Sequence, residues 1–275
     1  MGSFPSLTDL HVVPEGLLDL SSIKYNLPTT LRSLCISLDP APLTCYCQPS
    51  SLVRLPSLTY LDLPQSISFR QLQDVIAPAL SQLQTLRLYG ITQCFVGPPM
   101  IIPVYMNALT SLHLSSYHQL LKLDTLHAPH LENLTVHGYV SGCSSLKHSP
   151  HVREIEFLHL SHRELSAMSA IPSLVASLRS LTWRSVEVIQ PGALVASKLL
   201  ASELEKFSNL TSLTMPCVGI TDKIYHLPPL PRLQTLILPP ATVWVPVALS
   251  KFYPSLTSVY PTWTRCASNG LPHHQ

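Results

Sequence analysis

Side chains suited to molecular recognition recur at matching positions along this chain. They are tyrosine, arginine, histidine and carboxylate residues: Tyr60, Asp62, Arg87, Tyr89, His113, His137, Glu154, Glu156 and Arg184. Tyrosine and arginine are among the residue types that dominate the energetics of protein interfaces. We therefore expect this set to bind a protein partner. The alternative is a plain solvated surface, on which charges such as Asp62 and Arg87 only neutralise each other across strands.

Four histidines offer a second kind of chemistry. His127 and His130 stand four and one residues before Leu131, and His148 and His151 stand at the same positions before Val152. If the two segments stack as strands about 4.8 Å apart, the four imidazoles could converge at one rim. Such a cluster could bind zinc or respond to pH. Local copying of one repeat explains the same pattern, so we assign no metal to the chain.

Sequence motifs for catalysis are missing. The chain has no G-x-S-x-G turn, no glycine-rich phosphate loop and no H-E-x-x-H pair. Its nine glycines allow few loops that could close tightly around a small ligand. We expect no enzymatic activity and no cofactor.

A repeated apolar phrase must position these side chains. The phrase has the form Leu-x-x-Leu-x-Leu, and its copies begin at Leu7, Leu31, Leu58, Leu83, Leu109, Leu131, Val152, Leu178, Leu210, Leu233 and Leu256. Successive copies start 21 to 32 residues apart, a period typical of solenoid proteins. In an extended chain the last two apolar residues of a copy face one side. We therefore expect one strand per copy, stacked into a parallel sheet over a leucine core.

The register of this sheet follows from the phrase. The central outward position of each strand is occupied in turn by His11, Cys35, Asp62, Arg87, His113, Thr135, Glu156, Thr182, Thr214, Ile237 and Tyr260. Prolines such as Pro56 and Pro129 stand two residues before the first apolar position and should end the preceding crossover. We expect crossover helices over 69–80, 192–207 and 241–252, and only turns or 3₁₀ segments in the shortest repeats.

Composition excludes several classes of function. Only 12% of the 275 residues are charged, the net charge is +2, and no Lys/Arg cluster is present, which disfavours nucleic-acid binding. No apolar run reaches the roughly 18 residues of a membrane span, and no secretory signal opens the chain. The seven cysteines are scattered, with Cys45 and Cys47 as the closest pair, which is typical of reduced thiols. We expect an intracellular protein, cytoplasmic or nuclear.

The copies of the phrase resemble leucine-rich repeats over roughly residues 5 to 262. The resemblance implies an α/β fold: a right-handed solenoid of about eleven repeats, with the parallel sheet on the concave side and helices, 3₁₀ segments and turns on the convex side. The asparagine or cysteine usual three positions after the last leucine is absent from every copy. That absence disfavours the regular extracellular and ribonuclease-inhibitor-like classes. We interpret residues 1–263 as one domain and residues 264–275 as a polar tail.

The irregular repeats with a Pro-Ser-Leu-Thr-x-Leu lead are similar to the degenerate repeat regions of fungal F-box-type proteins. In that family an F-box recruits a cullin ubiquitin ligase and the solenoid holds the substrate. No F-box-like helical segment precedes Leu7. The resemblance therefore implies a substrate-recognition region, with ubiquitin-ligase components as partners if an upstream F-box exists. The alternative function is a structural protein that self-assembles by stacking its uncapped leucine ends.

Overall fold

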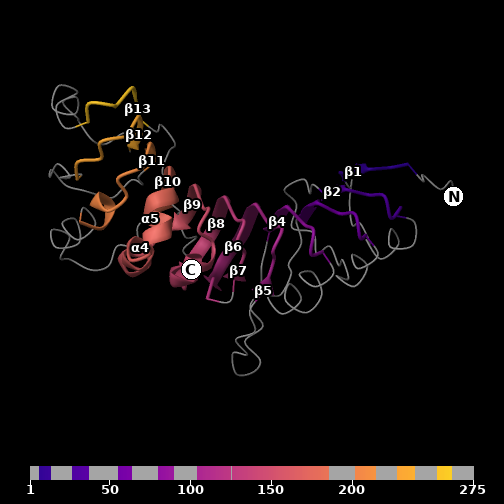
Figure 1. Ribbon diagram of the computed structural model, residues 1–275. Helices are drawn as coiled ribbons and strands as arrows, with labels where there is room; N and C mark the ends of the chain where they lie inside the picture. Colours follow the sequence, from indigo (N-terminus) through magenta and orange to yellow (C-terminus); the bar gives the residue numbers. More distant parts are fainter. Residues whose placement is uncertain are drawn as a thin grey trace, which may run out of the picture.

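The strands form one open parallel sheet (Figure 1). The computed structural model describes residues 6–13, 27–36, 55–63, 80–89, 104–124, 126–185, 202–214, 228–238 and 253–261. Within these ranges the sheet has eleven strands in the order β1-β2-β3-β4-β6-β8-β9-β10-β11-β12-β13. Their bounds are β1 Asp9–Val12, β2 Ser33–Ile36, β3 Tyr60–Leu63, β4 Thr85–Tyr89, β6 Ser111–Lys122, β8 Asn133–Ser141, β9 Glu154–His159, β10 Ser180–Ser185, β11 Ser212–Thr214, β12 Thr235–Leu238 and β13 Ser258–Pro261.

The predicted register is confirmed at every junction of this sheet. His11 pairs with Cys35, Cys35 with Asp62, and Asp62 with Arg87, and the alignment continues through to Ile237 and Tyr260. Each copy of the phrase thus contributes one strand, and equivalent residues lie side by side. The tail at 264–275 lies outside the described residues.

A tight turn leads into most strands. In nine copies the leading apolar residue donates its N–H to the carbonyl three residues earlier, as Leu58 does to Leu55 at 3.1 Å. Pro56 therefore occupies the second position of a four-residue turn, for which its fixed φ is suited. Pro129, Pro150, Pro231 and Pro254 stand at the same position of their own turns. The prolines mark the strand starts as predicted, and they do so by shaping this turn.

We call each strand, together with the segment that returns to the next strand, a coil. Threonines at the second position of the phrase form hydrogen bonds between successive coils. Thr59 Oγ1 donates to the carbonyl of Arg32 at 3.2 Å, and Thr211 Oγ1 donates to that of Arg179 at 3.0 Å. The same carbonyls also accept backbone N–H groups from the next coil. These hydroxyls add to the continuous ladder between coils and help to hold the strands in register.

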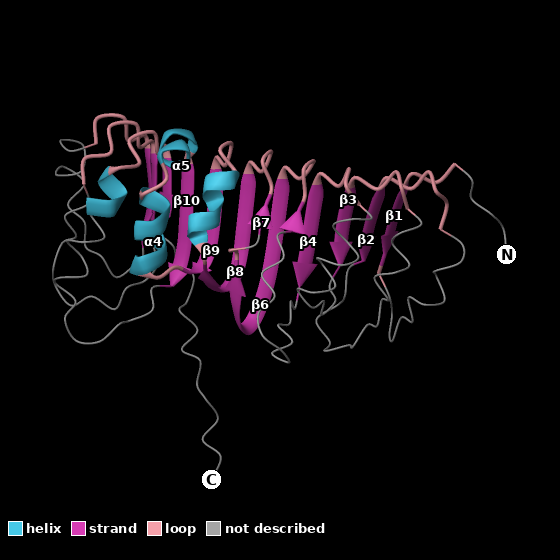
Figure 2. Ribbon diagram, turned by 60° about the horizontal axis from the view of Figure 1, so that its bottom comes forward, coloured by secondary structure: helices cyan, strands magenta, loops and turns pink. Residues whose placement is uncertain are grey.

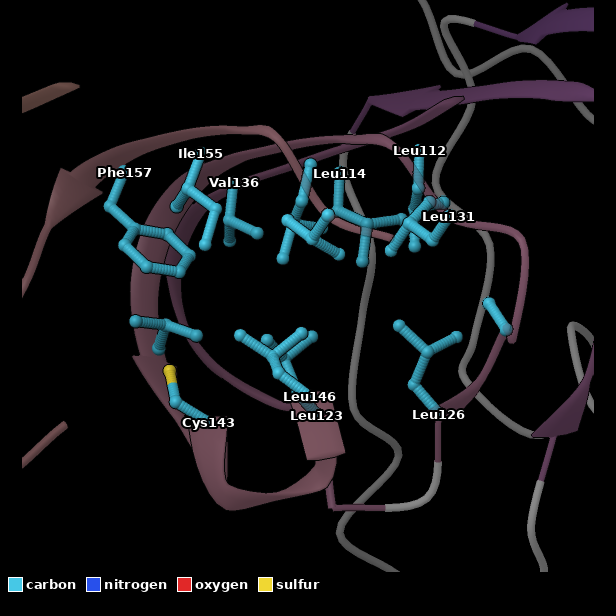
Figure 3. Close-up of a cluster of buried hydrophobic side chains, with 14 of the residues drawn as sticks. Leu112, Leu114, Leu123, Leu126, Leu131, Val136, Cys143, Leu146, Ile155 and Phe157 are labelled. Carbon is cyan, nitrogen blue, oxygen red and sulfur yellow. The ribbon is translucent and has the colours of Figure 1, made fainter. Parts of the chain in front are cut away.

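The core lies between the strands and the segments that return to the next strand. Figure 3 shows Leu114, Val136 and Phe157 on the strand side opposite Leu146 and Cys143 on the return side. These side chains are at most 2% exposed. Complete burial of a side chain such as leucine stabilises a fold by about 1.5–3 kcal/mol, so the stacked phrase supplies most of the driving force.

The return segments vary with repeat length. The 21-residue repeat holds the 3₁₀ helix η3 (Cys143–His148), which confirms the prediction for a short repeat. For the preceding, 22-residue repeat the same prediction is wrong, because its return segment contains the short strand β7 (Leu126–His127), which pairs with β5 (Val104–Tyr105) in a separate two-stranded sheet. Figure 2 shows the helical segments against one face of the row of strands.

Two helices between β9 and β10 were not expected from the sequence. In α4 (His162–Ser169) the hydroxyl of Ser161 accepts the N–H of Glu164 at 3.3 Å, and α5 (Pro172–Ser177) begins with a proline. A serine three residues before a glutamate, and a proline at the first helical position, are both start signals that the sequence displays.

The three predicted crossover helices fall mostly outside the described residues. Residues 202–205, within the predicted 192–207 helix, are helical. The segment 241–252 and all of 69–80 except Leu80 lie outside the described residues. In the part of the chain that is described, no helix is both long and apolar enough to cross a membrane.

Candidate functional site

The predicted recognition residues lie on the outward face of the central strands. Side chains alternate along each strand, so the leucines that enter the core leave the residues between them on the opposite face. We call the following set the central patch: Tyr60 and Asp62 on β3, Arg87 and Tyr89 on β4, His113 on β6, His137 on β8 and Glu156 on β9. Direct contacts divide the central patch into two clusters.

The first cluster joins β3 to β4. Tyr60 Oη donates to Asp62 Oδ2 at 3.3 Å, and Arg87 Nη1 lies 3.8 Å from the same carboxylate oxygen. The Arg87 guanidinium carbon also lies 5.8 Å from the centre of the Tyr60 ring, within the range of a cation–π contact. The opposite charges of Arg87 and Asp62 do neutralise each other, as expected if this face were only a solvated surface. Arg87 nevertheless keeps 46% of its side chain exposed, so it can still meet a partner.

Burial controls the electrostatics of this first cluster. Desolvation raises the pKa of Asp62, and Arg87 and the Tyr60 hydroxyl oppose that rise because both favour the carboxylate. Desolvation and the nearby Asp62 charge raise the pKa of Tyr60, so its hydroxyl stays protonated as a donor. The cluster is therefore a fixed arrangement of one acceptor, one cation and one ring.

The second cluster is a row of rings across β4, β6 and β8 that ends on β9. The Tyr89 and His113 ring centres lie 5.0 Å apart, and His113 and His137 meet edge to face at 4.8 Å. His137 Nε2 lies 3.5 Å from Glu156 Oε1. We call Tyr89, His113, His137 and Glu156 the ring row.

The ring row zigzags between two levels of the backbone register. Tyr89 and His137 both align with Ser115, whereas His113 aligns with Arg87 and Thr135. Ser115, which stands between Tyr89 and His137 in the register, is buried. The sequence register alone does not predict these contacts between rings at different register positions.

His113 is the most perturbed member of the ring row. Burial lowers its pKa to about 4, and the positive charges of His137 and Arg87 act in the same direction. Its Nε2 atom is buried and has no hydrogen-bond partner among the described residues. At neutral pH the ring is therefore uncharged and serves as a flat, half-buried surface.

The two remaining predicted residues, Glu154 and Arg184, are not part of the central patch. Glu154 is exposed on β9, aligned with Asn133 and Ser180, and it faces the same way as Glu156. Arg184 belongs to β10, but its side chain lies outside the described residues.

Sequence reasoning missed one ring pair on this face. The rings of Tyr139 and His159 stack at 4.5 Å with 12° between their planes, and Tyr139 is 40% exposed. Tyr139 continues the outward alternation of β8 beyond the end of the phrase, which is the signal that could have identified it. His159 departs from the alternation of β9 and comes opposite Tyr139 through a register shift that follows Val136, which the phrase does not predict.

The four histidines at the rim meet in two pairs. His127 and His148 stack at 5.0 Å, with Tyr105 on the other side of His127 at the same distance. His130 and His151 lie parallel at 6.3 Å. Among the described residues, no group of three or more histidine, cysteine, aspartate or glutamate side chains could hold a metal ion.

A buried carboxylate in the return segments stabilises the packing of two helices. Glu164 is 7% exposed, and its Oε2 accepts the backbone N–H of Cys143 at 2.8 Å, which joins α4 to the start of η3. Burial and the neighbouring Glu164 raise the pKa of the Cys143 thiol, which keeps it protonated and unreactive. Neither of the described cysteines, Cys35 and Cys143, belongs to a disulfide. Cys45 and Cys47 lie outside the described residues.

Neither a protein-family model nor a curated protein matches the chain.

Proposed function

We propose that this protein is a non-catalytic scaffold that holds a protein partner on the outward face of its sheet. The observation that carries the proposal is the ring row, in which three rings and a carboxylate on four adjacent strands are fixed against one another. The first cluster, with the partly exposed Arg87, borders it directly on β3 and β4.

The physical argument is preorganisation. A binding surface loses affinity when its side chains must be ordered on contact, by about 0.5–1.5 kcal/mol for each flexible side chain. Here each ring is already held by a neighbour, and the strands beneath are held by the leucine core. Tyrosine, histidine and arginine in such a row offer both flat apolar area and hydrogen-bonding groups.

The proposal extends to the kind of solenoid. The repeated phrase and eleven parallel strands in matching register support a leucine-rich-repeat solenoid whose sheet forms the concave side. A partner would then lie within the arc and contact several coils at once. An intracellular location, cytoplasmic or nuclear, fits the reduced state of the Cys35 and Cys143 thiols.

A narrower form of the proposal is a substrate-recognition region similar to that of F-box-type ubiquitin-ligase receptors. Its support is the resemblance of the irregular Pro-Ser-Leu-Thr repeats to those of that family. Cullin-ligase subunits should then be recovered together with the natural full-length protein. If a partner is captured reproducibly but cullin-ligase subunits are not, the ubiquitin-ligase form of the proposal is refuted. The general proposal of a protein-binding scaffold then remains.

The test is affinity capture with mass spectrometry, using the wild type and two double variants. Arg87→Ala/Tyr89→Ala removes one member from each cluster of the central patch. Tyr105→Ala/Arg163→Ala is the matched control, because it removes the same residue types from exposed positions on β5 and α4, away from the outward face. We expect the control to capture the wild-type set and the patch variant to lose specific members. Equal capture by all three proteins would show that the patch is not the site.

Self-assembly is the second candidate, and one observation favours it. Leu7, Leu10 and Val12 around β1 are only partly buried, and Val13 is 59% exposed, whereas the core residues of central strands are fully covered. A second copy stacked on β1 would cover them. Light scattering over a range of concentrations discriminates, because a monomer at every concentration excludes stacking.

A further inference from the structure

Histidine pairs gather at one junction between two coils of the solenoid. We call residues 109–130 the Leu109 coil and residues 131–151 the Leu131 coil. Three histidine pairs each take one ring from each coil: His113 with His137, His127 with His148 and His130 with His151. Their ring centres lie 4.8, 5.0 and 6.3 Å apart.

The three pairs surround the junction. His113 and His137 lie on the outward face of β6 and β8, while His127 and His148 lie on β7 and η3 among the return segments. The third pair lies at the turns that lead into β8 and β9. The leucine core drawn in Figure 3 lies between the strands, which carry the first pair, and the return segments, which carry the second.

Protonation is unfavourable at this junction for two reasons. Two imidazolium rings in contact repel each other, and the repulsion is screened least between His113 and His137, because both rings are half-buried. The other two pairs include exposed rings, so solvent screens their repulsion more strongly. In addition, His113 Nε2 and His127 Nδ1 are buried without a hydrogen-bond partner among the described residues. An imidazolium donates from both nitrogens, so each ring would hold a buried, unsatisfied N–H group.

The surrounding charges only partly offset the cost of protonating these histidines. His113 faces Tyr89, His137 and Arg87, and among the described residues Glu156 is the one nearby group that favours a proton on it. That carboxylate also lies 3.5 Å from His137 Nε2. On the return side His127 faces Tyr105 and His148, and Lys147 disfavours a proton on His148.

We propose that the junction between the Leu109 coil and the Leu131 coil is an acid-sensitive joint, closed while its histidine pairs are neutral and opened locally when they are protonated. This inference goes beyond the proposed function, because it concerns the solenoid itself and needs no partner. Only this junction among the described coils has three such pairs.

The direction of the pH effect follows from linkage. Burial, His137 and Arg87 lower the pKa of His113 to about 4, and burial and His127 lower that of His148. In an opened joint these rings titrate near pH 6.5, so the open form binds more protons between about pH 6.5 and 4. The closed joint therefore has its full stability above about pH 6.5 and loses it as the pH falls towards 4. At pH 5 the shift of His113 alone favours opening by about ten- to thirtyfold, the lower figure allowing for its partial exposure.

Hydrogen exchange on the full chain, read by mass spectrometry at pH 7.5 and pH 5, tests the joint. After correction for the intrinsic pH dependence of exchange, we expect protection of 111–122 and 133–141 to fall at least tenfold more than protection of 202–214. Equal changes in both regions would overturn the proposal.

Two triple variants make the test specific. His113→Gln/His127→Gln/His130→Gln removes one ring from every pair, and we expect it to lose the extra acid response. His11→Gln/His159→Gln/His162→Gln changes three histidines outside the three pairs and should retain it. Persistence of the response in the first variant would overturn the proposal. If that variant does not fold at pH 7.5, a histidine titration of the wild type by NMR decides: a His113 pKa below 5 supports the joint, and one at or above 6.5 refutes it.

Discussion

Gly142→Ala is the substitution that the structure penalises most specifically. Gly142 precedes η3 with φ of 76° and ψ of 27°, in the left-handed region. An alanine there costs about 1–2 kcal/mol from backbone strain alone. Its β-carbon would also overlap the Asp124 carboxylate group, closer than atoms can approach. Asp124 is exposed and can rotate away, which adds about 0.5–1.5 kcal/mol for a strained rotamer. We expect a total loss of about 2–3 kcal/mol.

Urea unfolding of four proteins separates the two contributions. They are the wild type, Gly142→Ala, Asp124→Ala and the double variant. Removing the aspartate side chain should relieve the clash but leave the backbone strain, so the double variant should recover about 1 kcal/mol relative to the sum of the single effects. The reasoning is refuted if Gly142→Ala is as stable as the wild type. The clash component is refuted if the two substitutions are additive.

Three further predictions concern the core and the patch. Glu164→Ala removes a charge-assisted hydrogen bond to the buried N–H of Cys143 and should lower the free energy of unfolding by about 1.5–3 kcal/mol, measured by urea titration. Leu134→Ala leaves a cavity at a side chain that is 1% exposed and should cost about 2–5 kcal/mol in the same assay, a loss below 1 kcal/mol being contradictory. Arg87→Ala removes the cation that opposes the burial-induced rise in the pKa of Asp62, so that pKa should rise further in an NMR titration; an unchanged value would show that the two residues do not interact.

The strands and their register could be predicted because the same rule applies in every coil. An apolar residue at alternate positions must enter the core, and one coil after another has this phrase, so Asp62 and Arg87 had to align. The return segments obey no such rule. Helix α4 depends on a local hydrogen bond between Ser161 and Glu164, a signal that is easily passed over beside the stronger leucine period.

The contacts within the site were less predictable than its position. Register placed His113 on the outward face, but it did not predict the ring contacts with Tyr89 and His137, which stand at the next outward position of their strands. The rim histidines form two separate pairs instead of one cluster. His127 contacts Tyr105 and His148, whereas His130 and His151 lie together in exposed turns. Side-chain direction, which the phrase does not encode, decides both arrangements.

The affinity of a captured, purified partner for the central patch tests the proposed function most directly. Calorimetric titration would compare the wild type with Arg87→Ala/Tyr89→Ala and with the control Tyr105→Ala/Arg163→Ala. Loss of an exposed arginine and a tyrosine from a binding site should weaken the complex at least tenfold, which corresponds to about 1.4 kcal/mol. We predict this loss for the patch variant and unchanged affinity for the control. Unchanged affinity in the patch variant, or an equal loss in both variants, would contradict binding on the outward face.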